Sequence, residues 1–281
     1  MMKKKILITG GNGYIGQLLY QSLFSMYDLD IVHGPSSQTK PSVDLTNKDE
    51  VDQFFIGKNY DVIINCAGTK DFNFCNTNIG GTMALNCHIV ENLLQKISSQ
   101  CQFIQLSSDY VFAPKTQSLP VISEDYPDTP YGESKLIAEQ ICRIYDKNYV
   151  IVRVAGVYSI NGGFLANLVD CYNKHEVFSA YSNWYYSPLY HTAFIEGVVS
   201  LIDDEVSKQT LNLVGNRVSR YDFAKEVLKQ GHFDQHLLTC DTDSKHEITD
   251  RSLAVSSYFS AKHICMLSYE DAIIDAMKKV I

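Results

Sequence analysis

The feature that most constrains this chain is a glycine-rich turn close to its N-terminus. A short apolar run predicts a buried strand over 4–9, and apolar residues at helical spacing predict a helix over 14–27. Three glycines stand between them, at Gly10, Gly13 and Gly16. Glycine at this spacing permits a tight turn, a close approach of the backbone to a pyrophosphate, and close packing of helix on strand. We expect the backbone amides of Tyr14 and Ile15, which open the helix, to face a phosphate.

Apolar strand-like runs and amphipathic helical segments alternate over the first half of the chain. Further strands are expected at 30–33, 61–66, 102–107 and 149–154, and further helices at 44–55, 82–97 and 131–146. Strands this apolar indicate an α/β fold with a doubly wound, Rossmann-type parallel sheet. The later part of the chain predicts an aromatic-rich stretch at 160–190, a strand at 211–214, and helices near 190–202, 220–230 and 269–280. We expect a dinucleotide-binding domain over 1–158 and a smaller, interleaved substrate-binding lobe over 159–281.

The composition limits which binding partners and which cellular compartment are expected for the chain. The formal charge of -8 at pH 7 disfavours binding to nucleic acid or to an anionic membrane, because both would repel the chain. The apolar run behind the N-terminal lysines is too short for a signal peptide, and no segment has the roughly 18 uninterrupted apolar residues of a membrane-spanning helix. The 8 cysteines contain no C-x-x-C pair. Reduced thiols in a cytoplasmic protein are therefore expected.

A cluster of polar residues follows the expected strand at 102–107. Ser108 ends this strand, and the next helix begins with Tyr131 and Lys135, which lie four residues apart on one helical face. A tyrosine phenol with a pKa of about 10 is a poor acid–base catalyst at neutral pH, but a nearby ammonium favours the phenolate and brings its pKa closer to neutrality. Ser108 is expected to hydrogen-bond a substrate oxygen and hold it beside the phenol. This pattern indicates proton transfer to or from an oxygen of the substrate.

The order of these motifs resembles the extended short-chain dehydrogenase/reductase family. The segments most similar to dTDP-4-dehydrorhamnose reductases within it are D-L-T at 44–46, D-V-I-I-N-C-A at 61–67, S-S-D-Y-V-F at 107–112, Y-G-E-S-K at 131–135 and S-P-L-Y at 187–190. The resemblance spans nearly the whole chain and is strongest over 5–158. It implies NAD(P)H-dependent reduction of a 4-keto group on a nucleotide-linked 6-deoxysugar, with Ser108, Tyr131 and Lys135 as the catalytic triad.

The same resemblance implies which residues hold the cofactor. Besides the glycine turn, Tyr131 and Lys135, they are Asp44 and Leu45 against the adenine, Cys66, Ala67 and Gly68 beneath the pyrophosphate and the nicotinamide ribose, Asn86 near the lysine, and Val154. The segment after the second strand does not decide between NADPH and NADH as the cofactor. This segment offers Ser36 and Lys40 but no carboxylate, which favours NADPH over NADH without excluding NADH.

The substrate site departs from the pattern of those reductases. The residues implied for it are Ser108, Asp109, Tyr110, Gly156, Trp184 and Arg251. Gly156 stands where the reductases have a tryptophan that contacts the sugar, and their acidic segment x-V-D-x-x-E becomes F-N-F-C-N at 72–76. Trp184 is the candidate for stacking on the base or the sugar, and Arg251 for binding the diphosphate. We therefore expect a related 4-keto sugar as the substrate rather than the rhamnose precursor itself.

Two other functions are left open by the sequence. One is a nucleotide-sugar C4 epimerase of the same superfamily, which would hold NAD without consuming it. The other is a non-catalytic, dinucleotide-binding regulatory subunit, against which the complete catalytic triad argues. No resident metal is expected, although Glu124 and Asp125 belong to an acidic loop where some of these reductases place a divalent ion. The nucleotide, the product stereochemistry and a homodimeric assembly are not decided by the sequence.

Overall fold

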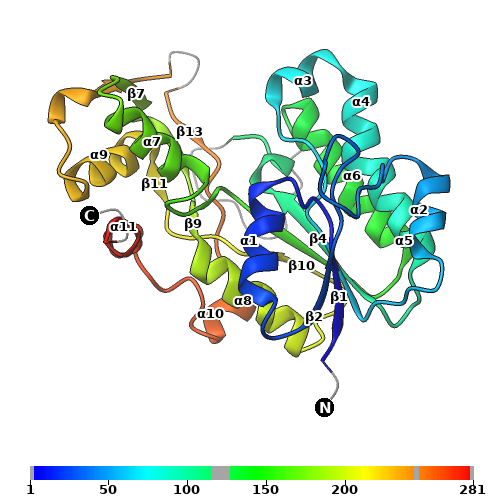
Figure 1. Ribbon diagram of the computed structural model, residues 1–281. Coiled ribbons are helices and arrows are strands. Elements are labelled where there is room, and N and C mark those ends of the chain that lie inside the picture. The colour runs from blue at the N-terminus through cyan, green and yellow to red at the C-terminus, as the bar shows by residue number, and fades with distance from the viewer. Residues whose placement is uncertain (1–2, 115–126, 244–246, 279–281) are drawn as a thin grey trace. The chain divides into compact units, whose positions relative to one another are not determined.

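The structure is a computed structural model that describes residues 3–114, 127–243 and 247–278 (Figure 1). The chain forms two compact units, each assembled from separate segments. Of the described residues, the first unit holds 3–111, 127–152 and 199–210, and the second holds 112–114, 153–198, 211–243 and 247–278. The domain boundary near residue 158 stays a prediction.

A six-stranded parallel sheet forms the centre of the fold, with the strand order β10-β5-β4-β3-β1-β2. Its strands are β1 (Lys5–Ile8), β2 (Asp28–Ile31), β3 (Val62–Asn65), β4 (Gln102–Ser108), β5 (Tyr149–Val154) and β10 (Gln209–Asn212). Every residue of β3 and β4 is buried, because helices cover both faces of a sheet of this kind. The predicted α/β, Rossmann-type fold is confirmed.

The order of the strands reverses next to β1. β2 lies on one side of β1 and β3 on the other, and an isolated parallel bridge joins His33, shortly after β2, to Ser42. In open α/β sheets, ligands bind outside the carboxyl ends of the strands at such a reversal. The residues that follow β1 and β3 are the glycine turn and the segment 66–68. The topology therefore places the predicted cofactor residues at the expected edge of the sheet.

The helices of the first unit are α1 (Tyr14–Leu23), α2 (Lys48–Phe55), α3 (Phe72–Thr77), α4 (Ile79–Met83), α5 (Ile89–Lys96) and α6 (Pro130–Tyr145). Buried residues of α2, α5 and α6 form an apolar core with residues of the sheet. The single helix predicted over 82–97 is wrong in one respect, because a π-helical turn at Ala84–His88 separates α4 from α5. Apolar periodicity does not reveal such a turn, and π turns often occur at functional sites.

The second unit consists of short strands and helices around an aromatic core that includes Tyr158, Tyr172 and Phe223. Its small sheets have the orders β11-β8-β13, β12-β7 and β6-β9. The strands are β6 (Val157–Tyr158), β7 (Phe178–Tyr181), β8 (Trp184–Tyr186), β9 (Leu189–Tyr190), β11 (Val218–Ser219), β12 (Leu238–Asp241) and β13 (Thr249–Asp250). The helices are α7 (Gly163–Asn173), α9 (Arg220–Gln230), α10 (Ser257–Ala261) and α11 (Tyr269–Met277), and α8 (His191–Asp203) continues from this unit into the first. Among the described residues, no helix has the length and apolar content needed to cross a bilayer.

Candidate active site

The glycine turn brings the end of β1 against the end of β3. Gly10 has a φ of +71°, and a Cβ there would lie 2.7 Å from the carbonyl carbon and oxygen of Cys66. A Cβ at Gly16 would lie 2.5 Å from the carbonyl oxygen of Gly10. Gly13 is the N-cap of α1 and has no side chain that could occupy the first amides of the helix. These contacts leave room for glycine alone at Gly10 and Gly16, and they fit the close approach of a pyrophosphate to the start of α1.

Thr9 fastens the segment after β3 to the glycine turn. Its hydroxyl donates to Asn65 Oδ1 at 2.6 Å and accepts from the backbone amides of Cys66 at 3.1 Å and Ala67 at 3.0 Å. The side chain of Thr9 is fully buried, so this set of hydrogen bonds is shielded from water. Thr9 was not predicted to have a role, because a small polar residue at the end of an apolar run is only a weak sequence signal.

Asn86, in the π-helical turn, connects the segment after β3 to α6. Its amide Oδ1 accepts from the backbone amide of Thr69 at 2.7 Å, and its Nδ2 donates to the Thr69 carbonyl at 3.0 Å and to Ser134 Oγ at 2.8 Å. Gly68 passes so close that a Cβ there would lie 2.6 Å from Asn86 Oδ1. We predicted that Asn86 acts near the lysine. In the structure it bonds Ser134, the residue before that lysine, and its action on the lysine stays a prediction.

The residues predicted to surround the adenine and its ribose follow β2. Ser36 is exposed in a turn that the Ser37 amide closes by donating to the Gly34 carbonyl at 3.0 Å. Asp44 Oδ1 accepts from the backbone amide and the hydroxyl of Thr46, at 2.9 and 2.6 Å. The side chain of Leu45 is buried in the core of the first unit, and its contact with an adenine stays a prediction.

Strand β4 and helix α6 bring the three predicted catalytic residues together. Ser108, the last residue of β4, hydrogen-bonds the Tyr131 side chain and donates to Asp109 Oδ1 at 2.8 Å. Lys135 lies one helical turn after Tyr131 and is buried, and its Nζ donates to the carbonyl oxygen of Leu106 on β4 at 2.6 Å. The hydroxyl, the phenol and the ammonium therefore come from the end of one strand and the start of one helix.

The environment of Tyr131 favours the protonated phenol. Burial raises the pKa of Tyr131, its hydrogen bond with Ser108 lowers it, and the Asp109 carboxylate raises it further. The sequence predicted that Lys135 brings this pKa towards neutrality, but here the net shift is upward and the ammonium is bonded to the Leu106 carbonyl. A phenol that keeps its proton at neutral pH is suited to donate that proton to a substrate oxygen.

A known protein family matches nearly the whole sequence of this chain. The model of the family described as RmlD substrate binding domain matches residues 3–267. The chain belongs to this family. Its sequence is 26% identical over 250 residues to a dTDP-4-dehydrorhamnose reductase of Mycolicibacterium smegmatis, covering 86% of this chain and 74% of the relative. It is 23% identical over 250 residues to a spore coat polysaccharide biosynthesis protein of Bacillus subtilis, covering 88% and 86%.

Solved structures give the same fold for this RmlD-family chain. A dTDP-4-dehydrorhamnose reductase from Bacillus anthracis, solved in complex with NADP, superposes with a TM-score of 0.87 over 99% of this chain and 100% of that one, at 20% identity. The predicted resemblance to these reductases is confirmed, and the chain is an oxidoreductase of the NAD(P)-dependent kind.

The ring of Tyr131 packs against two other aromatic rings in this RmlD-family chain. The ring of Phe72 lies 4.8 Å from that of Tyr110 and 5.3 Å from that of Tyr131, and the two tyrosine rings are 5.7 Å apart. Tyr110 was predicted to contact the substrate. Phe72 was noticed only as part of the segment that lacks the acids of related reductases. Its exposed ring forms an apolar surface beside the phenol of Tyr131.

Three residues predicted for the substrate, Gly156, Trp184 and Arg251, lie in the second unit. Gly156 is exposed, and a Cβ there would lie 3.8 Å from the Tyr186 ring. Trp184 is partly buried and stacks on Tyr181 with ring centroids 5.9 Å apart. Arg251 is buried and its Nη1 donates to the Phe112 carbonyl at 2.8 Å, and its role in binding a diphosphate stays a prediction. Val154, predicted for the cofactor, ends β5 and is partly buried.

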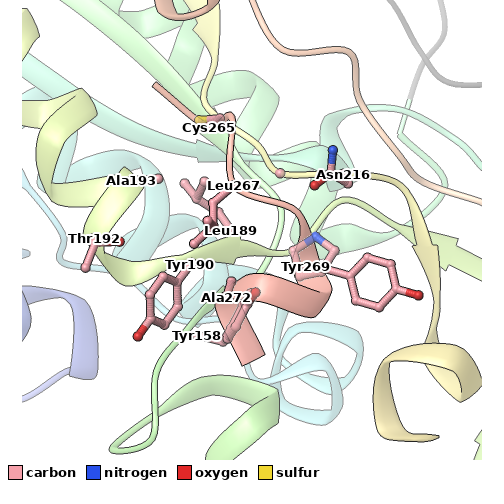
Figure 2. A pocket seen from close by; sticks show the side chains of 12 residues that line it. Tyr158, Leu189, Tyr190, Thr192, Ala193, Asn216, Cys265, Leu267, Tyr269 and Ala272 are labelled. Atoms are coloured by element: carbon pink, nitrogen blue, oxygen red, sulfur yellow. The ribbon is translucent and has the colours of Figure 1, made fainter. Parts of the chain in front are cut away.

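The second unit also contains a small cavity. Figure 2 shows its walls, which include Tyr158, Tyr190, Tyr269 and Cys265, and none of the predicted site residues lines it. In the described part of the chain, no three His, Cys, Asp or Glu side chains group in a way that could hold a metal ion. Glu124 and Asp125, considered for a divalent ion, lie outside the described residues.

Proposed function

We propose that this protein reduces the 4-keto group of a nucleotide-diphosphate-linked 4-keto-6-deoxy sugar with NAD(P)H, in the biosynthesis of a surface polysaccharide. The observation that carries the proposal is the meeting of Ser108, Tyr131 and Lys135 where β4 ends and α6 begins. Membership of the RmlD family and the similarity to a reductase and to a spore coat polysaccharide protein support the substrate class. We place the reaction in the cytoplasm and propose a homodimer as the assembly.

Each residue of the proposed triad has a separate role in the reaction. Ser108 hydrogen-bonds the carbonyl oxygen of the sugar and aligns it with the phenol. Tyr131, protonated at neutral pH because burial raises its pKa, donates its proton to that oxygen. Lys135 holds the ribose of the cofactor and stabilises the phenolate left after proton transfer. When bound, the reduced nicotinamide supplies the hydride.

The polar ends of β1 and β3 support a dinucleotide beside this site. Gly10 and Gly16 allow the backbone to pass close to a pyrophosphate, and Thr9 fixes the amides of Cys66 and Ala67 next to it. Phe72 and Tyr110 form an apolar surface next to the phenol, which suits the carbon-bound hydrogens of a deoxysugar. The missing acids and the glycine at 156 favour a 4-keto sugar other than the rhamnose precursor.

The test is turnover of a panel of enzymatically generated 4-keto-6-deoxy sugars linked to dTDP, GDP, CDP or UDP. Oxidation of NADPH with one panel member supports the reductase and identifies the nucleotide. Inversion at C4 without net oxidation of cofactor would show the epimerase instead. Tight dinucleotide binding with no turnover of any member would contradict both and favour a regulatory subunit.

Cofactor preference gives a separate prediction. We propose that Ser36 and Lys40, both exposed after β2, face the 2′-phosphate of NADPH. A carboxylate at this position would repel that phosphate and bind a free 2′-hydroxyl. Ser36→Asp is therefore expected to lower the ratio of NADPH to NADH affinity by about tenfold or more, since one close charge pair near a surface is worth roughly 1.4 kcal/mol or more. The measurement is the dissociation constant of each dinucleotide by fluorescence titration.

The matched control places the same charge elsewhere on the first unit. Ser99 is exposed after α5, and Ser99→Asp is expected to leave the affinity ratio unchanged. An unchanged ratio in the Ser36→Asp variant would place the 2′-phosphate away from this turn.

A further inference from the structure

Glu139 is a fully buried carboxylate on α6, and the mechanism above gives it no part. It follows Tyr131 by eight residues and Lys135 by four, so the three side chains leave the same face of the helix. A glutamate is rarely buried unless it is paired and hydrogen-bonded, because removing its charge from water is costly. The partners of this carboxylate therefore indicate why the fold retains it.

Each carboxylate oxygen has a partner on a different part of the first unit. Ser107 Oγ donates to Glu139 Oε1 at 2.6 Å, and Arg143 Nη2 pairs with Oε2 at 3.0 Å. Ser107 immediately precedes Ser108 on β4, so this hydrogen bond joins α6 to the strand end that carries the catalytic hydroxyl. Arg143 also donates to Thr210 Oγ1 at 3.0 Å, which anchors the pair at β10.

The charge of Glu139 also acts on Lys135. Burial lowers the pKa of Lys135, and Glu139 gives the largest effect in the opposite direction. Side chains at 135, 139 and 143 follow one another at four-residue spacing, with the signs positive, negative and positive. The buried ammonium is thus followed along the helix by a carboxylate that an arginine keeps paired.

Besides Glu139 and Tyr131, three titratable thiols from different elements face Lys135. Cys66 follows β3, Cys87 belongs to the π-helical turn, and Cys142 lies on α6. Burial raises the pKa of Cys66 and Cys142 to about 12 and that of Cys87 to about 11. These thiols are neutral at neutral pH, so they do not compensate the charge of the ammonium.

We propose that Glu139 is a positioning residue of the active site: its buried carboxylate holds Ser107 at the end of β4 and supplies the counter-charge for Lys135. The serine that precedes Ser108 and the ammonium beside Tyr131 are then fixed by one side chain. The expected effect on turnover rests on the proposed function, whereas the effect on Lys135 does not.

The decisive variant is Glu139→Gln, which keeps the size of the side chain and an oxygen that can accept from Ser107 but removes the charge. The Lys135 pKa is expected to fall by about one unit or more, which is a tenfold change in its proton affinity. The measurement is NMR titration of the protein labelled with 13C at the lysine ε-carbons, with the Lys135 signal assigned from its absence in Lys135→Arg. Because the ammonium is the required form, the alkaline limb of the kcat/KM profile is expected to move to lower pH by the same amount.

The control is Glu133→Gln, the same substitution on an exposed position of the same helix, for which neither the titration nor the pH profile should change. An unshifted Lys135 titration in folded Glu139→Gln overturns the inference. If the titration shifts but the wild-type protein turns over no member of the sugar panel, the proposed function has failed and the charge pairing stands.

A second variant covers the case in which Glu139→Gln does not fold. Glu139→Asp keeps the charge but shortens the reach to Ser107 by one methylene. It is expected to leave the Lys135 titration close to that of the wild type and to lower kcat, and lowering the pH should not restore the rate. Full activity of this variant would contradict the positioning of β4 by Glu139.

Discussion

Tyr131→Phe is expected to lower the turnover of the sugar panel by about a thousandfold, within the range that general acid catalysis contributes. The substitution removes one hydroxyl, and with it the proton that we assign to the carbonyl oxygen. Ser108 still donates to Asp109, and the ring still packs against Phe72 and Tyr110, so the fold around the site is kept. The measurement is the rate of NADPH oxidation under saturating substrate.

Binding of the dinucleotide separates loss of chemistry from loss of structure in this variant. The phenylalanine variant is expected to bind NADPH as the wild type does, because the glycine turn and Thr9 are untouched. Its stability to urea should fall by no more than about 1 kcal/mol, which is the usual net worth of one hydrogen bond. Retention of more than about a tenth of the wild-type rate, against the 100-fold or larger loss expected for a general acid, would remove Tyr131 from that role.

The central strands were predictable because burial on both faces leaves an unbroken apolar run. The prediction at 149–154 coincides with β5, and that at 61–66 contains β3. β2 begins two residues earlier than predicted, because its first residues alternate between aspartate and leucine near the edge of the sheet. The strand was predicted from its apolar residues alone, and its start, which carries an aspartate, was therefore missed.

Short helices escaped prediction for a different reason. α3 has 6 residues, fewer than two turns, which is too short for a 3.6-residue periodicity to be distinguished from a loop. α7 has 11 residues, but it lies in the stretch at 160–190 that was described only as aromatic-rich, and no helix was predicted there. The glycines before it give no side-chain cap that would signal the start of a helix.

The candidate site was predictable where chemistry fixes the spacing. Tyr131 and Lys135 share a helical face in any α-helix, and Ser108 follows from the end of β4. The directions of Leu45 and Arg251 were not predictable, because a side chain's orientation is set by the tertiary packing around it. Leu45 packs in the core and Arg251 bonds to a backbone carbonyl, and neither fact has a local sequence signal.

Gly132→Ala is expected to have the second largest effect, through the contact between α6 and the chain after β4. A Cβ at Gly132 would overlap the carbonyl oxygen of Tyr110 and lie 2.9 Å from Cβ of Pro127. Alanine ordinarily stabilises a helix interior by about 0.5–1 kcal/mol relative to glycine. The overlap is with backbone, which cannot rotate away, so overpacking of about 1–3 kcal/mol outweighs this gain. We expect a lower urea midpoint and a turnover reduced by about 100-fold, because α6 must shift and carry Tyr131 away from Ser108.

Gly80→Ala is the control that separates the steric effect from helix propensity. Gly80 lies in α4, and a Cβ there would meet nothing within 4 Å. Its substitution is expected to raise stability by about 0.4–1 kcal/mol, since alanine restricts the unfolded chain at no cost to the folded one. Turnover should stay at the wild-type rate. If Gly132→Ala behaved in the same way, the helix would not be held against Tyr110, and the glycine of the Y-G-E-S-K segment would have no part in placing Tyr131 beside Ser108.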